Sequence, residues 1–123
     1  MPNHKVLLIE DESDIALIIQ NILDMQQIET IIAPDGGTAL ALLKQHPVQG
    51  IILDLNLPDM NGMELHDRII AAFPELKGKF LFMSGYDIDN ELEAVLQRTQ
   101  NLFIHKPFHL DKFRRAVENL LSR

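Results

Sequence analysis

Short apolar runs alternate with helical patterns five times along the chain. Five runs have the length and the β-branched content of buried strands, at residues 5–9, 28–32, 50–54, 79–83 and 102–105. After each run, apolar residues recur at intervals of three and four, the spacing of one helix face. These inward positions span residues 15–23, 39–43, 65–72, 88–95 and 110–121. The pattern predicts five strands that alternate with five helices.

Turn residues and caps indicate where the helices begin and end. Ser13 is expected to cap the first helix, whose inward face includes Ile18. Residues 34–37, Pro-Asp-Gly-Gly, predict a turn before a short helix over residues 38–45. Residues 58–62 predict a loop, and the third helix should end before Pro74.

Five consecutive strand–helix units predict an α/β fold with one doubly wound (βα)5 domain. The sheet should be parallel, with helices on both faces. The flavodoxin-like strand order 2-1-3-4-5 fits five strands best. The chain has 123 residues and shows no linker, repeat or low-complexity segment, so we expect a single domain over residues 1–123 with no output domain.

Composition and charge narrow the classes of function. The net charge is −7 and there is no basic run, which argues against direct nucleic-acid binding. There is no cysteine, so disulfides and thiolate metal sites are excluded. No apolar run approaches the roughly 18 residues of a membrane span, and the first residues lack a signal-peptide pattern. We therefore expect a cytoplasmic domain without membrane contact.

Polar side chains follow four of the predicted strands at the point where each ends. Glu10 and Asp11 follow the first strand, Asp54 ends the third, Ser84 follows the fourth and Lys106 the fifth. The carboxyl ends of parallel strands share one edge, where such sheets bind ligands. The sequence therefore predicts one site with three carboxylates, a hydroxyl and an ammonium.

This set of groups suits a divalent cation and a phosphoryl group. Three carboxylates repel one another unless a cation joins them or one takes a proton, and hard oxygen ligands favour Mg²⁺. Asp54 can act as a nucleophile, with Lys106 and Ser84 as donors to phosphoryl oxygens. Taken alone, Glu10 and Asp11 fit equally well as acids at the start of a helix, Ser84 as a turn residue and Lys106 as a solvated lysine.

Four strings then make the interpretation specific. They are VLLIEDE, IILDLNLPDMNGMEL, FLFMSGYD and LFIHKPF, and with them the chain resembles the receiver domain of two-component response regulators over essentially its whole length. In that family, a proline and a glycine follow the phosphoacceptor by four and eight residues, as Pro58 and Gly62 follow Asp54. The family separations of 30 and 52 residues to the hydroxyl residue and the lysine are also matched, by Ser84 and Lys106.

The resemblance assigns roles to individual residues. It implies that Asp54 is the phosphoacceptor and that Asp11 binds Mg²⁺ directly, with Mn²⁺ as a substitute ion. Glu10 would bind directly or through water, and the backbone carbonyl of Asn56 would complete the protein ligands. The Lys106-Pro107 peptide bond is implied to be cis.

The resemblance also implies which four positions act in the switch or in hydrolysis of the phosphoryl group. Ser84 and Phe103 are the expected switch residues, with an ordinary core phenylalanine as the alternative interpretation of Phe103. Asn56 and Tyr86 occupy positions that tune hydrolysis in the family, and Tyr86 could equally be an exposed loop tyrosine. Lys106 is expected on a solvated edge, so its removal should leave the melting temperature nearly unchanged or raised.

The resemblance implies a signalling switch that takes a phosphoryl group from a histidine kinase or a phosphotransfer protein. It would catalyse only its own phosphorylation and dephosphorylation, without turning over a metabolite. The fourth helix, last strand and closing helix would then act on an unknown output domain or protein partner, and self-association is left open. A phosphorylation-independent docking module is the alternative, while an FMN protein is disfavoured by the acidic loop after the first strand.

Overall fold

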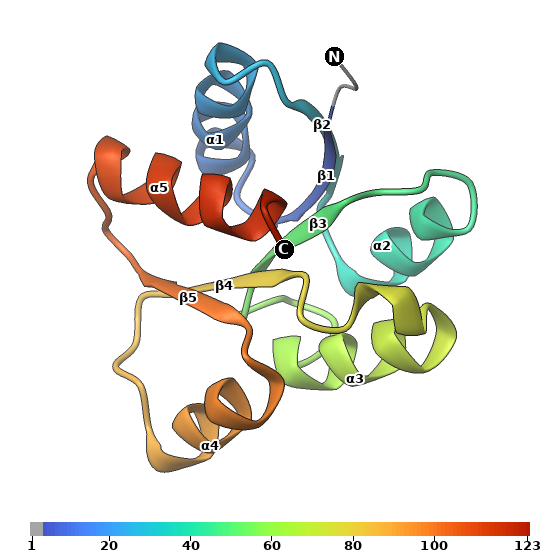
Figure 1. The fold of residues 1–123 in the computed structure, drawn as a ribbon. Helices are drawn as coiled ribbons and strands as arrows, with labels where there is room; N and C mark the ends of the chain where they lie inside the picture. Colours follow the sequence, from blue (N-terminus) through green and yellow to red (C-terminus); the bar gives the residue numbers. More distant parts are fainter. Residues whose placement is uncertain (1–3) are drawn as a thin grey trace.

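The computed structural model of the chain describes residues 4–123, so residues 1–3 of the expected domain lie outside the described part. Five strands form one parallel sheet in the order β2-β1-β3-β4-β5, which confirms the predicted fold and strand order (Figure 1). The strands are β1 (Lys5–Ile9), β2 (Glu29–Ala33), β3 (Gly50–Asp54), β4 (Phe80–Ser84) and β5 (Leu102–His105). The helices are α1 (Ser13–Met25), α2 (Gly36–Leu43), α3 (Gly62–Ala72), α4 (Asn90–Thr99) and α5 (Leu110–Leu121), and a 3-10 turn spans Pro74–Leu76.

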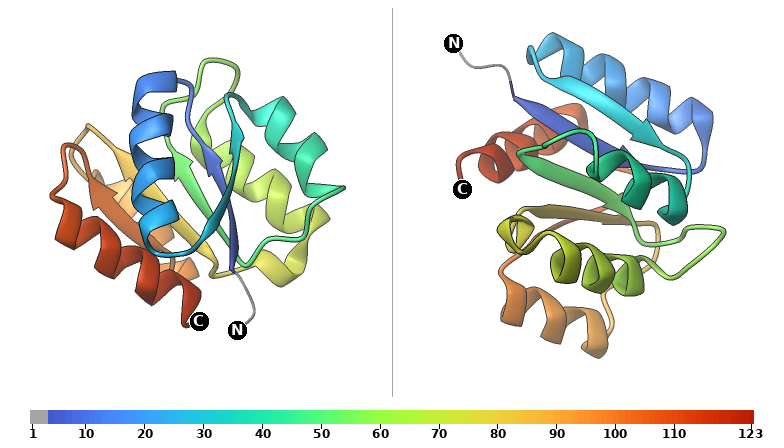
Figure 2. Two further views of the ribbon diagram at one scale, coloured as in Figure 1. Left: turned by 90° about the horizontal axis from the view of Figure 1, so that it is seen from above. Right: turned by 90° about the vertical axis from the view of Figure 1, so that its right-hand side faces the viewer.

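Alternating strand residues build one core on each face of the sheet. Val6, Leu8 and Ile52 pack on one side with buried residues of α1 and α5. Leu7 and Ile51 pack on the other side with buried residues of α2 and α3. Seen from above, the sheet runs between these two layers of helices (Figure 2). All five residues of β3 are buried, as expected for a central strand covered on both faces.

The helix α4 is held more lightly than the other helices. It has no buried residue, whereas α5 buries Phe113, Val117 and Leu120. Within the described residues 4–123, Leu96 is the one α4 side chain that packs, partly buried, against a core, and it does so on the α2–α3 side. A helix with so little buried apolar surface is free to shift at low cost.

Two predicted helix starts are wrong by one or two residues. The first helix begins at Ser13 itself, and Glu12 precedes it as the N-cap without a side-chain bond. The helix α2 begins at Gly36, because the Asp35 carboxylate accepts the Thr38 N–H at 2.7 Å and so caps a turn that reads as a loop in the sequence.

The predicted inward faces also differ at some positions. Ile18 is 58% exposed, because α1 turns Ala16, Ile19 and Ile22 toward the sheet instead. A small residue such as alanine lets a helix lie close to the strands beneath it. Ile88 lies outside α4 and is exposed, and Leu110 at the start of α5 is exposed as well.

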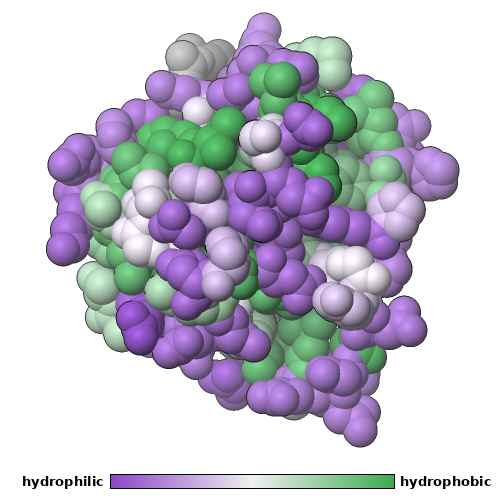
Figure 3. All heavy atoms as spheres, turned by 180° about the vertical axis from the view of Figure 1, so that it is seen from behind, coloured by the Kyte–Doolittle hydropathy of each residue, from purple (hydrophilic) through white to green (hydrophobic). Residues whose placement is uncertain are grey.

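The surface of the described chain is mixed. Seen from behind, hydrophobic areas are broken up by polar side chains rather than joined into one continuous face (Figure 3). No helix within residues 4–123 combines the length and the hydropathy needed to cross a membrane.

Candidate functional site

The register of the sheet brings the predicted polar residues to one edge. Ile9 pairs with Leu53, so the residues that follow them, Glu10 and Asp54, lie side by side. Asp54 in turn pairs with Met83, which precedes Ser84. The Lys106 N–H donates to the Ser84 carbonyl at 2.8 Å and so continues the pairing of β4 with β5. The parallel pairing alone therefore assembles residues from four strands.

Three carboxylates converge at this edge, as the sequence predicted. Oxygen atoms of Glu10, Asp11 and Asp54 all lie within 4.8 Å of one another. Glu10 and Asp54 are buried, while Asp11 is exposed. Buried hard oxygens with an open, exposed ligand beside them fit a cation such as Mg²⁺, which keeps part of its water shell.

Lys106 lies inside this cluster. Its ammonium is 2.7 Å from Glu10 Oε1 and 3.0 Å from Asp54 Oδ2. The expectation of a solvated edge is wrong, because only 18% of the Lys106 side chain is exposed. The ammonium thus bridges the two buried carboxylates and neutralises part of their repulsion.

The electrostatics of the cluster shift two pKa values. Burial raises the pKa of Glu10 to about 7, and its hydrogen bond with Asp54 adds to that rise, while Lys106 opposes it. Burial works against the charge of Lys106, but its bonds to Glu10 and Asp54 prevail and raise its pKa. Lys106 is therefore a permanent cation near neutral pH, and Glu10 is the carboxyl that exchanges a proton there.

A second set of contacts surrounds the other oxygen of Asp54. The Asn56 N–H donates to Asp54 Oδ1 at 2.9 Å, and the Asn56 side-chain amide lies 3.5 Å from Ser84 Oγ. Ser84 Oγ also accepts the Tyr86 N–H at 3.0 Å. Both oxygens of Asp54 are thus held, one by an ammonium and one by a backbone N–H. These contacts fix the orientation of the carboxylate.

Tyr86 and Phe103, expected to tune hydrolysis and to act in the switch, surround the site without joining the carboxylate cluster. The Tyr86 side chain is 71% exposed, and it lines a hollow of about 290 Å³ together with Asn56, Ser84 and the start of α4. Phe103 is half-buried and packs on the α2–α3 core. Phe103 is therefore neither a fully buried core residue nor a freely exposed one.

The peptide bond that follows Lys106 has the expected geometry. The Lys106-Pro107 bond is cis, as the resemblance implied.

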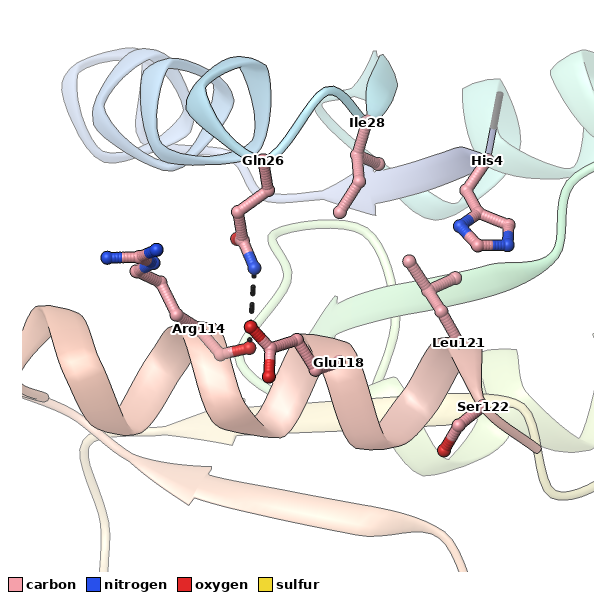
Figure 4. Close-up of a pocket in the computed structure, with 7 residues that line it drawn as sticks. All are labelled: His4, Gln26, Ile28, Arg114, Glu118, Leu121 and Ser122. Atoms are coloured by element: carbon pink, nitrogen blue, oxygen red, sulfur yellow. Dashed lines mark hydrogen bonds between the residues drawn. The ribbon is translucent and has the colours of Figure 1, made fainter. Parts of the chain in front are cut away.

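A groove of about 410 Å³ between α1 and α5 lies beside His4, at the amino end of β1, and Gln26 reaches across it to the Arg114 carbonyl (Figure 4). Because it is at the opposite end of the strands, this groove is not part of the site.

Comparison with known proteins decides the family. Residues 6–118 match the response regulator receiver domain. The chain belongs to this family. Receiver domains act as phosphoryl-transfer switches in two-component systems and bind Mg²⁺ at an acidic pocket, and this chain has an acidic cluster of Glu10, Asp11 and Asp54.

Curated relatives of this receiver domain differ in length. Chemotaxis protein CheY-3 of Vibrio cholerae is 32% identical over 98% of this chain and 94% of its own length. Regulatory protein LuxO of Vibrio vulnificus is 31% identical over 94% of this chain but only 25% of its own length. The chain thus spans about a quarter of the LuxO relatives that it matches.

Solved structures share the fold. The receiver domain of the Francisella response regulator 1452 has a TM-score of 0.85 at 26% identity, over 98% of both chains. The signal receiver domain of a LuxO repressor protein from Vibrio parahaemolyticus has a TM-score of 0.88 at 24% identity, over 99% of this chain and 92% of that one.

The sequence interpretation missed two groups around the receiver site. It treated Asn56 as a carbonyl ligand and a tuning position, but its backbone N–H holds Asp54 and its side chain reaches toward Ser84. It treated Asp59 only as part of a loop, although the Asp59 carboxylate bonds the first residues of α2. The bonds from Gly36 and Gly37 to Asp59 join residues more than 20 positions apart, so no local sequence pattern could reveal them.

Proposed function

We propose that this receiver domain accepts a phosphoryl group on Asp54 from a histidine kinase or a phosphotransfer protein. One observation carries the proposal: the Lys106 ammonium bridges Asp54 and Glu10 at 3.0 and 2.7 Å, beside a carboxylate whose second oxygen is held by a backbone N–H. This arrangement holds the Asp54 carboxylate in one orientation at the end of a buried strand and keeps a cation beside it for the incoming charge. The expected cytoplasmic location is part of the proposal.

The transfer step follows from these contacts. An Asp54 oxygen attacks the phosphorus of a phosphohistidine or of a small acyl phosphate, and the new P–O bond forms as the P–N or P–O bond to the donor breaks. The leaving imidazole or carboxylate takes away the electron pair of the broken bond. Lys106 then donates its hydrogen bond to a phosphoryl oxygen instead of to the Asp54 carboxylate, as a point charge that stabilises the anionic product.

The chain offers a donor set for the cation that receiver domains use. Glu10, Asp11 and Asp54 would supply carboxylate oxygens, and Asn56 would supply its backbone carbonyl, with Mn²⁺ as a substitute ion. When bound, Mg²⁺ neutralises charge on the phosphoryl oxygens. The exposed Asp11 is the ligand whose carboxylate is most accessible to an entering ion, whereas Glu10 must first lose its contact with Lys106 or its proton.

The switch itself would begin at Ser84. Its oxygen accepts the Tyr86 N–H and no acceptor for its own hydroxyl is found among the described residues, so the hydroxyl can turn toward a phosphoryl oxygen. A shift of Ser84 would change the space around the half-buried Phe103, which packs against the same core as Leu96 of α4. The lightly held α4, with β5 and α5, would then present a different surface to an output domain, to another protein or to a second copy.

Loss of the phosphoryl group would complete the cycle without turnover of a metabolite. Water must reach the phosphorus from the open side of the site, where Asn56 and Tyr86 are exposed. These two side chains are therefore placed to tune the rate of autodephosphorylation.

Intact mass spectrometry tests the proposal. Incubation with Mg²⁺ and acetyl phosphate or phosphoramidate should add the mass of one phosphate group to the wild type and none to Asp54→Asn. A matched control is Asp111→Asn, because Asp111 is an exposed acid at the start of α5, and this variant should be labelled like the wild type. Equal labelling of wild type and Asp54→Asn would overturn the assignment.

A further inference from the structure

Asp59 joins two parts of the molecule that frame the acceptor site. One carboxylate oxygen accepts the Gly36 N–H at 3.0 Å, and the other accepts the Gly37 N–H at 3.2 Å. These N–H groups open α2 and have no partner within the helix. The contact holds the pKa of Asp59 below its usual range, chiefly through the Gly36 N–H. Both oxygens of one carboxylate thus fasten the loop after β3 to α2.

Packing strengthens this attachment. A Cβ atom at Gly36 would lie only 2.8 Å from the Met60 sulfur, so the absence of a side chain at Gly36 is what lets Met60 rest on the helix backbone. The helix is anchored to the sheet by Ala39 and Leu43, which are buried. The contact partner of Asp59 is therefore a fixed support rather than a mobile one.

The acceptor loop, residues 55–62, is closed at its base. The Gly62 N–H donates to the Leu55 carbonyl at 3.1 Å, and Asn56 and Asn61 form an antiparallel bridge. A Cβ atom at Gly62 would lie 2.6 Å from the Leu55 Cα, which shows how closely the two ends of the loop approach. The acceptor loop is therefore a small hairpin with Asp59 near its tip and Asn56 at its base.

We propose that Asp59 is a positioning residue for the phosphoryl-acceptor site. By tying the tip of the acceptor loop to α2, it holds Asn56 in place against Asp54 and Ser84. Asn56 is exposed, so little packing holds it apart from the loop that carries it, and its N–H must stay 2.9 Å from Asp54 Oδ1. The inference rests on the proposed function and adds a residue that touches neither the phosphoryl group nor the cation.

A matched pair of variants tests whether Asp59 positions the acceptor loop or only caps α2. Asp59→Ala removes the contact between the acceptor loop and α2. Asp35→Ala also removes a carboxylate bonded at the start of α2, but that carboxylate accepts the Thr38 N–H within the same helical turn. Both variants lose one negative charge and capping bonds of the same helix, two in Asp59→Ala and one in Asp35→Ala, but only Asp59→Ala also loses the tie to the acceptor loop.

Hydrogen exchange and the rate of phosphorylation distinguish Asp59→Ala from Asp35→Ala. In metal-free protein, hydrogen exchange of the Asn56 amide should become about tenfold faster in Asp59→Ala and stay near the wild-type rate in Asp35→Ala, because only the first variant frees the loop. With Mg²⁺ and acetyl phosphate, phosphorylation should slow by about tenfold in Asp59→Ala and by less than about twofold in Asp35→Ala. Asp59→Asn, which keeps one acceptor oxygen, should lie between Asp59→Ala and the wild type.

The outcomes are distinguishable. If the wild type takes up no phosphate, the proposed function fails, and the exchange measurement alone decides the role of Asp59. If Asp59→Ala matches Asp35→Ala in both measurements, Asp59 is only a cap and the inference is overturned. Should Asp59→Ala not fold, the same comparison between Asp59→Asn and Asp35→Asn decides, with faster exchange at Asn56 in Asp59→Asn alone as the supporting result.

Discussion

Lys106 and Glu10 are 96 residues apart in the sequence, and their side chains form a 2.7 Å ion pair inside a cluster of carboxylates. The ammonium lies between Glu10 and Asp54 and offsets the repulsion of the two buried carboxylates when both are ionised. The same ammonium is the donor that we propose for the phosphoryl group. Stability of the resting site and chemistry of transfer thus depend on one side chain.

The pKa of Glu10 predicts how stability depends on pH. Its folded value of about 7 is above the ordinary value of 4.5, so the folded protein binds this proton more tightly than the unfolded chain. The resulting stabilisation is complete below about pH 4.5 and is lost as the pH rises through about 7, an effect on the order of 1–3 kcal/mol. Without metal, the free energy of unfolding in urea should fall from about pH 5 to about pH 8.

Glu10→Gln is the matched variant for this effect, because glutamine mimics the protonated acid in shape. Its free energy of unfolding should depend less on pH than that of the wild type and exceed it near pH 8. If the unfolding free energies of the wild type and Glu10→Gln change in parallel from about pH 5 to about pH 8, Glu10 does not titrate as we infer.

Lys106→Ala should destabilise the metal-free protein, contrary to what a solvated lysine would do. Without the ammonium, the buried Glu10 and Asp54 face each other uncompensated, and unfolding free energy should fall by about 1–3 kcal/mol near pH 8. The loss should shrink at lower pH, where Glu10 takes up a proton. Lys112→Ala is the control, since Lys112 is exposed on α5, and should change stability by less than about 0.5 kcal/mol. An unchanged urea midpoint for Lys106→Ala would contradict the bridging role.

The helix α4 should be the most responsive element. Its amide hydrogens should exchange faster than those of α5, because α4 buries no residue and α5 buries three. On treatment with beryllofluoride, NMR signals of α4 and of Phe103 should shift more than those of α2. Shifts that stay confined to the loops around Asp54 would contradict the proposed route through Ser84 and Phe103.

Much of the fold follows from local features of the sequence. The fully apolar run that ends in Asp54 predicted a central strand, and β3 occupies residues 50–54 with every residue buried. Polar residues just past the strand ends predicted the shared edge, because parallel strands align their carboxyl ends. Glu10 and Asp54 therefore could be placed together without coordinates.

Features that depend on long-range packing could not be predicted. Whether Lys106 points into solvent or between two carboxylates depends on the distance from β5 to β1, which have two strands, β3 and β4, between them in the sheet. The exposure of Ile18 depends on how closely Ala16 lets α1 approach the strands. The bonds of Asp59 to α2 require a loop geometry that the sequence pattern does not encode.

The most direct test of the central claim is to locate the phosphoryl group. Borohydride reduces an aspartyl phosphate to homoserine, so protein treated first with Mg²⁺ and acetyl phosphate and then with borohydride should contain homoserine at position 54 alone, as read by peptide mass spectrometry. We expect this modification in the wild type, less of it in Lys106→Ala, and none without Mg²⁺. Homoserine at another acidic position would contradict the assignment of Asp54. So would protein that has gained the mass of a phosphate but contains no homoserine after reduction.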